Sequence, residues 1–423
     1  MQFKPYPEYK DSGVEWLGEI GASFNLKRLK HLSASRLSYG ANEAADEAIS
    51  DHPRFIRITD IADDGRLKSD TFRSLPPEKA GPYMLADGDI LLARSGATVG
   101  KSFKYLKEWG LSCYAGYLIK FSTDYRNNNS SFIYYYLNSI FYWNYIRSSE
   151  IQSTIQNVSA EKYSDLIVTL PSADEQSKIV SFLDGETTKI DNLIAKQEKL
   201  IELLEEQRKS VITHAVTKGL DPDAPMKDSG VEWLGEVPAH WDTSSLKYLC
   251  NINTGNNDTV DSVENGIYPF FVRSQLIERI NEYSFDCEAI LTAGDGAGVG
   301  KIYHHYKGRF SCHQRVYALT DFKRISPDLF FYFFSNLFEK VALDGGAKST
   351  VDSLRKAHFD NFIMVVPPDT EQFQIVEFLN REVVKIDKSI SKQKDLIEKL
   401  KEYRSSVISH AVTGKIDVRD MAA

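Results

Sequence analysis

The chain has 423 residues, with 42% hydrophobic and 26% charged side chains and a net charge of −8. At roughly 150 residues per domain this length predicts two to four domains, and the composition excludes a disordered chain or a fibrous repeat. The acidic balance excludes a generic basic nucleic-acid coat, because no part of the chain has a marked excess of Lys and Arg that the total would hide.

The sequence carries no signal for a membrane or for secretion. No stretch approaches a length of about 18 consecutive apolar residues, so we expect no transmembrane helix. The start, Met1–Tyr6, has no apolar core of the kind found in a secretory signal. The four cysteines form no Cys-x-x-Cys pair, which is typical of a protein of the reducing cytoplasm, and we expect a cytoplasmic location.

The chain is an internal duplication. The decapeptide Lys-Asp-Ser-Gly-Val-Glu-Trp-Leu-Gly-Glu at residues 10–19 returns unchanged at residues 227–236, and residues 171–217 match residues 367–413 at 27 of 47 positions. Between these shared segments the copies differ in nearly everything except a few glycines and apolar runs. We therefore predict a first variable domain (1–170), a first long helix with linker (171–226), a second variable domain (227–366) and a second long helix (367–423).

Short β-strand patterns separated by turn residues mark both variable domains. The first copy predicts strands at residues 54–58, 90–93 and 117–121, and the second copy predicts strands at 269–272, 289–292 and 316–319. An aromatic-rich helix follows in each copy, at residues 132–143 and 329–338. We expect these aromatic side chains in the core, because no basic residues are interleaved with them.

A loop with the letters Val-Gly-Lys follows the middle strand in each copy, and residues 94–107 and 301–315 beside it carry basic residues and no acidic ones. A phosphate-binding P-loop would need glycine in place of Ser95 and Asp295, so we reject nucleotide binding. The pattern favours a loop that contacts DNA phosphates and base edges, with a plain turn of solvated lysines as the alternative. The candidate DNA-binding residues are Arg94, Ser95, Lys101, Lys104, Lys107, Lys301, His304, Lys307, Arg309 and Arg315.

The duplicated segments after Pro171 and Pro367 predict long helices, with acidic residues in the first turn. Roughly 42 residues at about 1.5 Å each would span about 60 Å. Apolar residues recur at spacings of four and three, which is typical of a coiled-coil seam, with Gln and Arg at the same seam positions in both copies. The seam residues are Ile190, Ile194, Gln197, Ile201, Leu204, Arg208 and Val211 in the first copy, and Ile386, Ile390, Gln393, Ile397, Leu400, Arg404 and Val407 in the second.

We favour pairing of each long helix with its copy over the alternative that each helix lies only on its own domain. An approximate two-fold axis would make the pair antiparallel and place one variable domain at each end. The predicted fold class is therefore α+β, with two globular α/β domains separated by two long helices in an antiparallel coiled coil, as a pseudo-two-fold internal repeat.

Catalytic and metal-binding motifs are missing. The sequence has no Asn-Pro-Pro-Tyr/Phe, His-Glu-x-x-His or Gly-x-Ser-x-Gly motif, so we expect no catalytic residues in this chain. The pairs His304-His305 and Cys312-His313 match no common zinc spacing, and we expect no metal. His214 and His410 lie at equivalent helix ends, where a capping or packing role is the simpler interpretation.

The order of variable domain, long helix, variable domain and long helix, with the decapeptide opening each half, resembles the specificity subunit of type I restriction-modification enzymes. The Pro-x-x-x-Glu-Gln helix start and the Val-Gly-Lys loop resemble that family too. One departure is that the first opening continues Ile20-Gly-Ala-Ser-Phe24 where the second has Val237-Pro-Ala-His-Trp241. The resemblance implies two target-recognition domains, each reading one half of a bipartite, asymmetric site on double-stranded DNA, and a helix pair that sets the gap.

The resemblance also implies partners. Two methyltransferase subunits would dock on the helices and the flanking shared segments, and restriction and translocase subunits would join them. S-adenosylmethionine, ATP and magnesium would belong to those partners, with no cofactor and no membrane contact in this chain. Two other hypotheses stay open at this point: a coiled-coil adaptor between protein partners, and an enzyme with an unrecognised active site.

Overall fold

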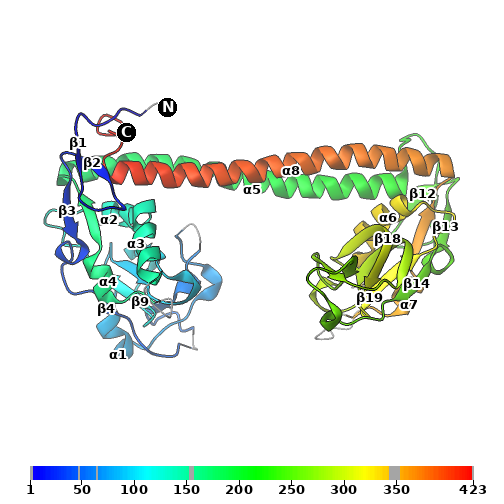
Figure 1. Cartoon of the computed structure of the whole chain (residues 1–423), viewed down its shortest axis with the longest axis horizontal. Helices are drawn as coiled ribbons and strands as arrows, with labels where there is room; N and C mark the ends of the chain where they lie inside the picture. Colours follow the sequence, from blue (N-terminus) through cyan, green and yellow to red (C-terminus); the bar gives the residue numbers. More distant parts are fainter. Residues whose placement is uncertain (1–2, 46–47, 63–64, 152–156, 343–352, 422–423) are drawn as a thin grey trace. The chain divides into compact units, whose positions relative to one another are not determined.

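The computed structural model describes residues 3–45, 48–62, 65–151, 157–342 and 353–421. The chain divides into two compact units: unit 1 comprises residues 1–198 and 394–423, and unit 2 comprises residues 199–393. The two long helices, α5 (Ala173–Lys218) and α8 (Asp369–Val412), are each unbroken, and each contributes one part to either unit (Figure 1). α8 lies within the matched segment 367–413, and α5 ends one residue beyond the matched segment 171–217. None of the helices in the described part of the chain is long and apolar enough to cross a membrane.

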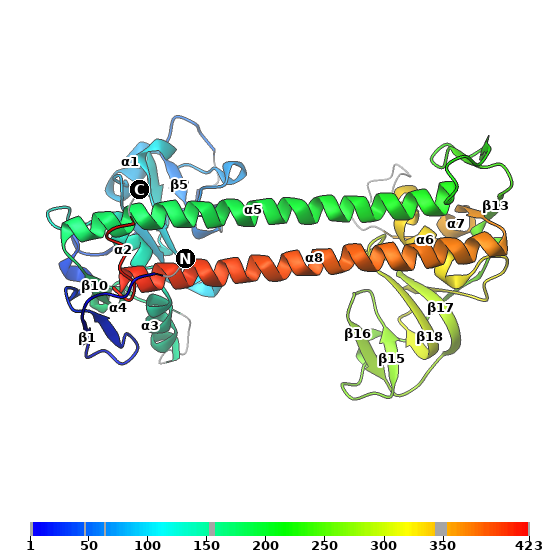
Figure 2. The ribbon, with the colours of Figure 1, turned by 90° about the horizontal axis from the view of Figure 1, so that it is seen from above.

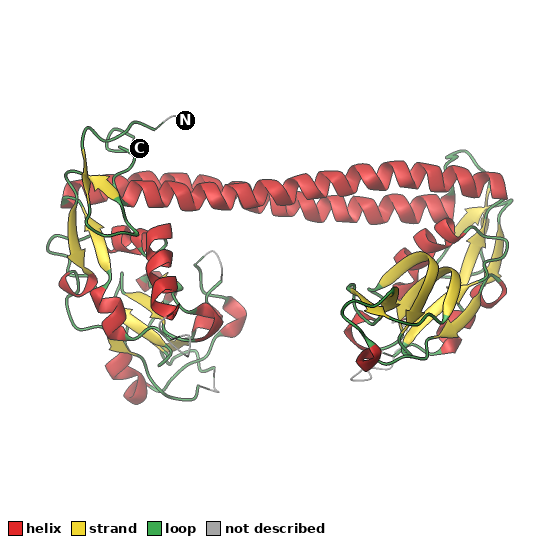
Figure 3. Ribbon diagram, in the orientation of Figure 1, coloured by secondary structure: helices red, strands yellow, loops and turns green. Residues whose placement is uncertain are grey.

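Unit 1 combines helices and sheet, as the sequence predicted (Figure 3). Its strands are β1 (Tyr9–Asp11), β2 (Glu19–Gly21), β3 (Asn25–Arg28), β4 (Ser38–Tyr39), β5 (Arg54–Ile56), β6 (Ile90–Ala93), β7 (Ser102–Lys104), β8 (Ser112–Tyr114), β9 (Leu118–Phe121) and β10 (Ile167–Leu170). Its shorter helices are α1 (Pro77–Ala80), α2 (Ser130–Tyr136), α3 (Ile140–Ile151) and α4 (Ala160–Asp165). The central sheet has the antiparallel order β4-β9-β6-β7, and β5 pairs in parallel with β8. The predicted strands at 54–58, 90–93 and 117–121 are confirmed within two residues at each end.

The central strand β6 separates two hydrophobic clusters in unit 1. Because side chains alternate along a strand, Ile90 and Leu92 face one side and Leu91 faces the other. The first side packs against the aromatic helices α2 and α3 and against α5 and α8, through buried residues such as Phe132 and Tyr142. The predicted core position of these aromatic side chains is confirmed.

Unit 2 has a larger sheet (Figure 2). Its strands are β11 (Met226–Asp228), β12 (Glu236–Pro238), β13 (Asp242–Ser245), β14 (Asn251–Thr254), β15 (Tyr268–Phe271), β16 (Ile277–Ile280), β17 (Phe285–Ala293), β18 (Tyr303–Cys312), β19 (Val316–Thr320) and β20 (Ile363–Val366). Its shorter helices are α6 (Pro327–Ala342) and α7 (Lys356–Asp360). The sheet order is β14-β19-β17-β18-β15-β16, and only the β15–β18 pair in this sheet is parallel. One face packs on α6 through Phe330, Phe334 and Phe338, so the second aromatic helix is also a core element.

The two sheets share a pattern of strand pairing, although the sequences of these strands differ. In unit 2 the long β18 pairs with β17 on one side and with β15 on the other. In unit 1 two strands share these roles: β7 pairs with β6, and β8 pairs with β5. The short 3₁₀ helix η6 (Lys107–Trp109) lies between β7 and β8 and interrupts what is one strand in unit 2.

The Glu-Gln pair in the first turn of each long helix anchors that helix to its unit through side-chain hydrogen bonds. In unit 1 the Gln176 carboxamide donates to Pro171 O (3.0 Å) and accepts from Asn129 N–H (2.8 Å), at the start of α2. In unit 2 the Gln372 carboxamide donates to Pro367 O (2.9 Å) and accepts from Ser326 N–H (2.7 Å), at the start of α6. Both glutamines are buried, so these bonds are shielded from water.

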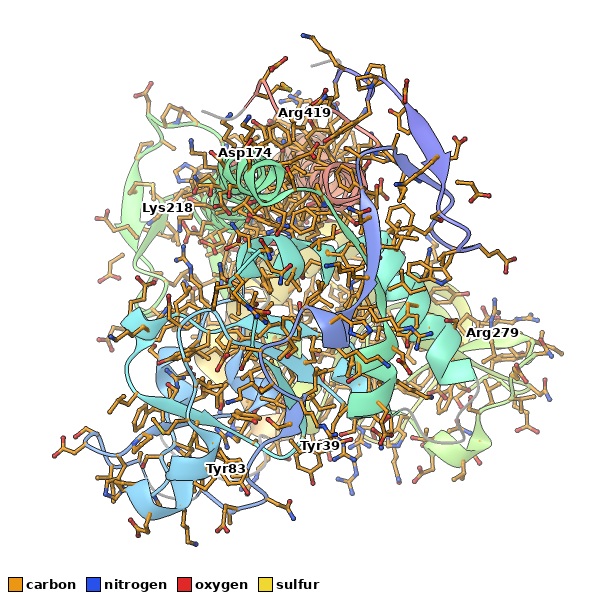
Figure 4. All side chains as sticks on the ribbon, turned by 90° about the vertical axis from the view of Figure 1, so that its left-hand side faces the viewer. Tyr39, Tyr83, Asp174, Lys218, Arg279 and Arg419 are labelled. Carbon is orange, nitrogen blue, oxygen red and sulfur yellow. The ribbon has the colours of Figure 1, made fainter. Side chains whose placement is uncertain are left out.

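The glutamates of the same pairs bond to aromatic residues near the decapeptide of each unit. Glu175 accepts a hydrogen bond from the Tyr6 hydroxyl (2.7 Å), and Arg419 lies 3.9 Å from it. Figure 4 labels Arg419 close to Asp174 at the beginning of α5. In unit 2 Glu371 accepts from the Trp241 indole nitrogen (2.9 Å).

An aromatic ring closes the helix end in each unit. The end of α8 packs on Phe24 in unit 1, and the end of α5 packs on Trp241 in unit 2; both rings are fully buried. The departure from the family pattern at Phe24 therefore leaves this packing intact.

The predicted seam positions of α5 and α8 are buried or half-buried, whereas most of their neighbours are exposed. In unit 1 Arg404 of α8 bonds to Asp191 of α5 (2.8 Å), and the later residue Val412 accepts from Thr169, which lies just before α5 (2.6 Å). In unit 2 Arg208 of α5 bonds to Asp387 of α8 (2.9 Å). Both predicted seam arginines thus bond to an aspartate of the other helix.

Candidate nucleic-acid interface

A turn at the end of β6 in unit 1 lies beside two other backbone segments. Arg94 N–H donates to Tyr117 O (3.1 Å), in the turn between β8 and β9. Arg94 O accepts from Val158 N–H (2.8 Å), and Ser95 forms an isolated β-bridge with Asn157. These bonds fix the backbone at the start of the Val-Gly-Lys loop, which continues through the 3₁₀ helix η5 (Gly96–Thr98).

Unit 2 has the same backbone arrangement at the end of β17. Gly294 N–H donates to Arg315 O (2.8 Å), Gly294 O accepts from Leu354 N–H (2.7 Å), and Asp295 bridges to Ser353. The 3₁₀ helix η9 (Gly296–Gly298) follows, as η5 does in unit 1. Gly294 therefore occupies the position of Arg94, Asp295 that of Ser95, and Arg315 that of Tyr117.

A glycine permits a close backbone approach next to each of these turns. A Cβ on Gly40 would lie 2.3 Å from Tyr114 O, and a Cβ on Gly255 would lie 1.7 Å from Cys312 O. Both distances are impossible for a real side chain, so glycine is required at these two positions.

We call the four residues Tyr39, Arg94, Ser95 and Tyr117 the turn surface of unit 1. The Arg94 guanidinium lies over the Tyr39 ring, 4.7 Å from its centroid, a cation–π geometry that orients it. Among the residues that the structure describes, the buried Arg94 Nε has no hydrogen-bond partner. Tyr117 is 67% exposed. Tyr39 lies on the side of unit 1 away from α5 and α8 (Figure 4).

We call the four residues Arg273, Asp295, Gln314 and Arg315 the turn surface of unit 2. The Asp295 carboxylate accepts hydrogen bonds from Arg273 Nη1 (2.9 Å) and from Arg315 Nη1. Burial alone would raise the pKa of Asp295, but the bonds from Arg315 and Arg273 outweigh it and hold that pKa below its ordinary value. Gln314 donates to Asp258 (2.9 Å). A cavity of about 220 Å³ lies between Asp295, Gln314, Arg315 and their neighbours.

The turn surfaces contain three of the ten predicted DNA-binding residues, namely Arg94, Ser95 and Arg315. Three predicted lysines are exposed in or near the same loops: Lys101, Lys107 and Lys301. Lys307 and Arg309 lie on β18 directly opposite acidic residues of β17 and pair with them: Lys307 with Glu288 (3.2 Å) and Arg309 with Asp286 (2.9 Å).

Lys104 and His304 point into their units, and this placement disfavours DNA contact through their side chains. Lys104 Nζ bonds to Ser131 Oγ (2.7 Å), and burial lowers its pKa. His304 is buried against Phe271, and burial lowers its pKa in spite of a hydrogen bond with Ser274 O. Neither orientation could be read from loop spacing, because it depends on which strand face is covered.

The sequence interpretation missed five residues that the structure brings into or beside the basic loops. Tyr39, Tyr117, Arg273, Asp295 and Gln314 complete the turn surfaces. An amide side chain next to a basic residue is a weak signal that could have indicated Gln314, which precedes Arg315, whereas Tyr117 has no basic neighbour in the sequence. Arg273 carries no such signal, because only the parallel pairing of β15 with β18 brings it to the loop. In the described residues no group of three His, Cys, Asp or Glu side chains could hold a metal ion.

A sequence model of the type I restriction modification DNA specificity domain matches residues 55–206 and 238–402, about three quarters of the chain. The chain belongs to this family. Each of the two matches covers most of one variable domain and part of the long helix that follows it.

Named relatives are distant. The type I restriction enzyme EcoDI specificity subunit of Escherichia coli is 27% identical over 182 residues, 43% of this chain and 40% of that protein. The MjaVIII specificity subunit of Methanocaldococcus jannaschii is 25% identical over 40% of this chain and 37% of its own. These matches span less than half of the relatives' length.

Solved structures share the fold at low identity. A chain from a study of complex assembly and conformational transition of the type I R-M system superposes with a TM-score of 0.72 at 15% identity, covering 94% of this chain and 99% of that one. The HsdS subunit of Thermoanaerobacter tengcongensis gives a TM-score of 0.51, also at 15% identity, covering 96% of this chain and 100% of that one. At such identity these likenesses establish the fold, with two recognition domains, and no more.

Proposed function

We propose that this chain is the DNA-recognition subunit of a type I restriction-modification complex and has no catalytic role of its own. Each unit reads one half of a bipartite, asymmetric site. One observation carries the proposal: both units hold the same backbone frame at their turn surfaces and expose different side chains there. A shared frame with different exposed residues suits two readers of unlike sequences.

Binding by the turn surfaces is compatible with the acidic chain. Arg94 and Arg315 suit base edges, whereas Lys101, Lys107 and Lys301 suit phosphates, because a guanidinium can bond bidentately and a lysine acts as a point charge. Partner subunits supply the remaining phosphate contacts in this scheme. Lys307 and Arg309 are weaker candidates, because each already has an acidic partner across the strand.

The long helices serve as spacer and docking site in this proposal. Arg404–Asp191 in unit 1 and Arg208–Asp387 in unit 2 pair later residues of one helix with earlier residues of the other, which supports an antiparallel coiled coil along the predicted seam. The spacer sets the gap between half-sites. Two methyltransferase subunits dock on it, restriction and translocase subunits join them, and S-adenosylmethionine, ATP and magnesium bind to those partners in the cytoplasm.

The test is a methylome. DNA from cells that carry this chain with its methyltransferase subunits is compared with DNA from cells that lack only this chain. We expect a split motif with two unlike halves that disappears without the chain. If the partners are expressed and active and no methylation depends on the chain, the proposal is wrong, and the adaptor hypothesis takes its place.

A further inference from the structure

Arg315 has a fixed backbone and an exposed side chain. Its N–H donates to His313 Nδ1 (3.0 Å), and its carbonyl accepts from Gly294 N–H (2.8 Å). These bonds tie the turn between β18 and β19 to the end of β17. The side chain of Arg315 is nevertheless 60% exposed. A residue with this combination presents its guanidinium to solvent from a defined position.

Asp295 lies beneath that guanidinium with a side chain only 10% exposed. Its two carboxylate oxygens are divided between two arginines: Oδ1 accepts from Arg273 and Oδ2 from Arg315. Two guanidinium groups face this one carboxylate, and a second acidic residue, Asp258, lies near Arg315 and accepts from Gln314. A guanidinium has five N–H donors, so the bond from Nη1 leaves donors of Arg315 for a second partner.

We propose that Arg315 reads a guanine in the half-site recognised by unit 2, and that Asp295 is the positioning residue that holds Arg315 for this contact. The inference rests on the proposed function. Two parallel donors of arginine match the O6 and N7 acceptors of guanine in the major groove. Holding the guanidinium in advance reduces the rotamer entropy that binding must remove.

The comparison of the units favours a base contact over a phosphate contact. Phosphates are the same in both half-sites. A phosphate contact at the position of Arg315 would therefore call for a basic residue at the equivalent position of unit 1. Unit 1 has the uncharged Tyr117 at the position of Arg315. Bases differ between half-sites, and a tyrosine in one unit with an arginine in the other fits that difference.

The experiment uses the chain in complex with its methyltransferase subunits and duplexes of the methylome-derived site, with one base pair replaced at a time. For Arg315→Ala we expect discrimination at a single G·C pair, in one half only, to fall by about 5- to 100-fold, with other positions unchanged. Arg315→Lys keeps the charge and should lose the same discrimination. Because the side chain is exposed, neither change endangers folding.

Asp295→Asn tests positioning. We expect a smaller loss at the same base pair, and no additional loss when it is combined with Arg315→Ala, because Asp295 acts through Arg315. Asp242→Asn is the matched control, since Asp242 also pairs with an arginine of unit 2, Arg324 (2.7 Å), away from the turn surface. It should leave discrimination at every position unchanged.

Three outcomes overturn the inference. If Arg315→Ala weakens binding to all duplexes equally and reduces the salt slope by about one, Arg315 contacts a phosphate. If Asp295→Asn still reduces discrimination in the Arg315→Ala background, Asp295 does not act through Arg315. If Arg315→Lys keeps full discrimination, bidentate reading is wrong. In each case the chain-dependent split motif would remain, so these failures differ from a failure of the proposed function, in which no such motif exists.

Discussion

The two turn surfaces have the same backbone and different chemistry. Arg94 in unit 1 and Gly294 in unit 2 make equivalent hydrogen bonds to the following turn, yet the exposed residue of that turn is Tyr117 in one unit and Arg315 in the other. The orienting contact differs as well: an aromatic ring lies under Arg94, and a carboxylate lies under Arg315. Backbone hydrogen bonds therefore hold the scaffold, and such bonds tolerate exchange of the side chains.

The ends of the long helices differ less between the units, because there the glutamines are identical and both buried rings are aromatic. Gln176 and Gln372 make matching bonds, and Phe24 and Trp241 occupy matching buried positions. We therefore expect changes at the helix ends to destabilise a unit, and changes at the turn surfaces to alter its binding.

The largest expected effect is at the buried rings. Trp241→Ala should lower the free energy of unfolding of unit 2 by about 3–5 kcal/mol, and Phe24→Ala should do the same in unit 1, because each leaves a cavity under a helix end. Urea-dependent hydrogen exchange, resolved by unit, measures both. Trp241→Phe is the control, since unit 1 uses phenylalanine here, and it should cost about 1 kcal/mol for the lost bond to Glu371. If Trp241→Phe lowers the free energy of unfolding as much as Trp241→Ala does, a phenylalanine cannot replace Trp241, and Phe24 and Trp241 are not equivalent.

The second-largest loss of stability is expected at the glycines beside the turns. Gly255→Ala and Gly40→Ala should each cost about 3 kcal/mol in their own unit, because the new Cβ would collide with a backbone carbonyl of the neighbouring strand. Hydrogen exchange of β19 and of β9 reports the two effects. Gly185→Ala, in α5 with no atom of the described residues within 4 Å of its added Cβ, should instead stabilise the helix by up to about 1 kcal/mol. If Gly40→Ala is tolerated and Gly255→Ala is not, the backbone arrangements around the two turn surfaces are less alike than their hydrogen bonds indicate.

The helix-start glutamines are expected to have an intermediate effect. Gln176→Ala and Gln372→Ala should each cost about 2 kcal/mol, because each leaves a buried carbonyl and a half-buried N–H without its bond to the glutamine. Chemical denaturation of the purified complex measures the cost. The exposed neighbour Gln374 is a matched control, and its change to alanine should stay within about 0.5 kcal/mol. If the free energy of unfolding falls by different amounts for the changes at residues 176 and 372, the two glutamines do not contribute equally to their units.

The ion pairs between the long helices should contribute least. Arg404→Ala in unit 1 and Arg208→Ala in unit 2 should each cost about 0.5 kcal/mol or less, because both pairs are partly exposed and screened by water. Double-mutant cycles with Asp191→Ala and Asp387→Ala isolate the coupling energies. A coupling above about 1 kcal/mol in one pair only would mean that the helices are held more tightly in that unit.

Much of this molecule could be predicted from the sequence. The exact decapeptide repeat and the matched segments located two halves, and the spacing of apolar residues predicted α5 and α8 close to their observed bounds, because helical periodicity is a local property of the chain. The apolar runs at residues 90–93 and 316–319 predicted β6 and β19, because such runs are also a local property of the chain. The aromatic residues at 132–143 and 329–338 were placed correctly in the cores.

The tertiary structure alone decided which residues meet. Lys104 and His304 face inward because of the sheet face on which strand register places them, and that register is set by partners distant in the chain. Arg273, Asp295 and Arg315 come from three separate segments, so no spacing in the sequence connects them. The packing of the chain's last residues on its first variable domain was equally hidden, because it depends on contacts between Phe24 and Gly414 across nearly the whole length of the chain. Local patterns determined the elements, and long-range pairing determined the surfaces.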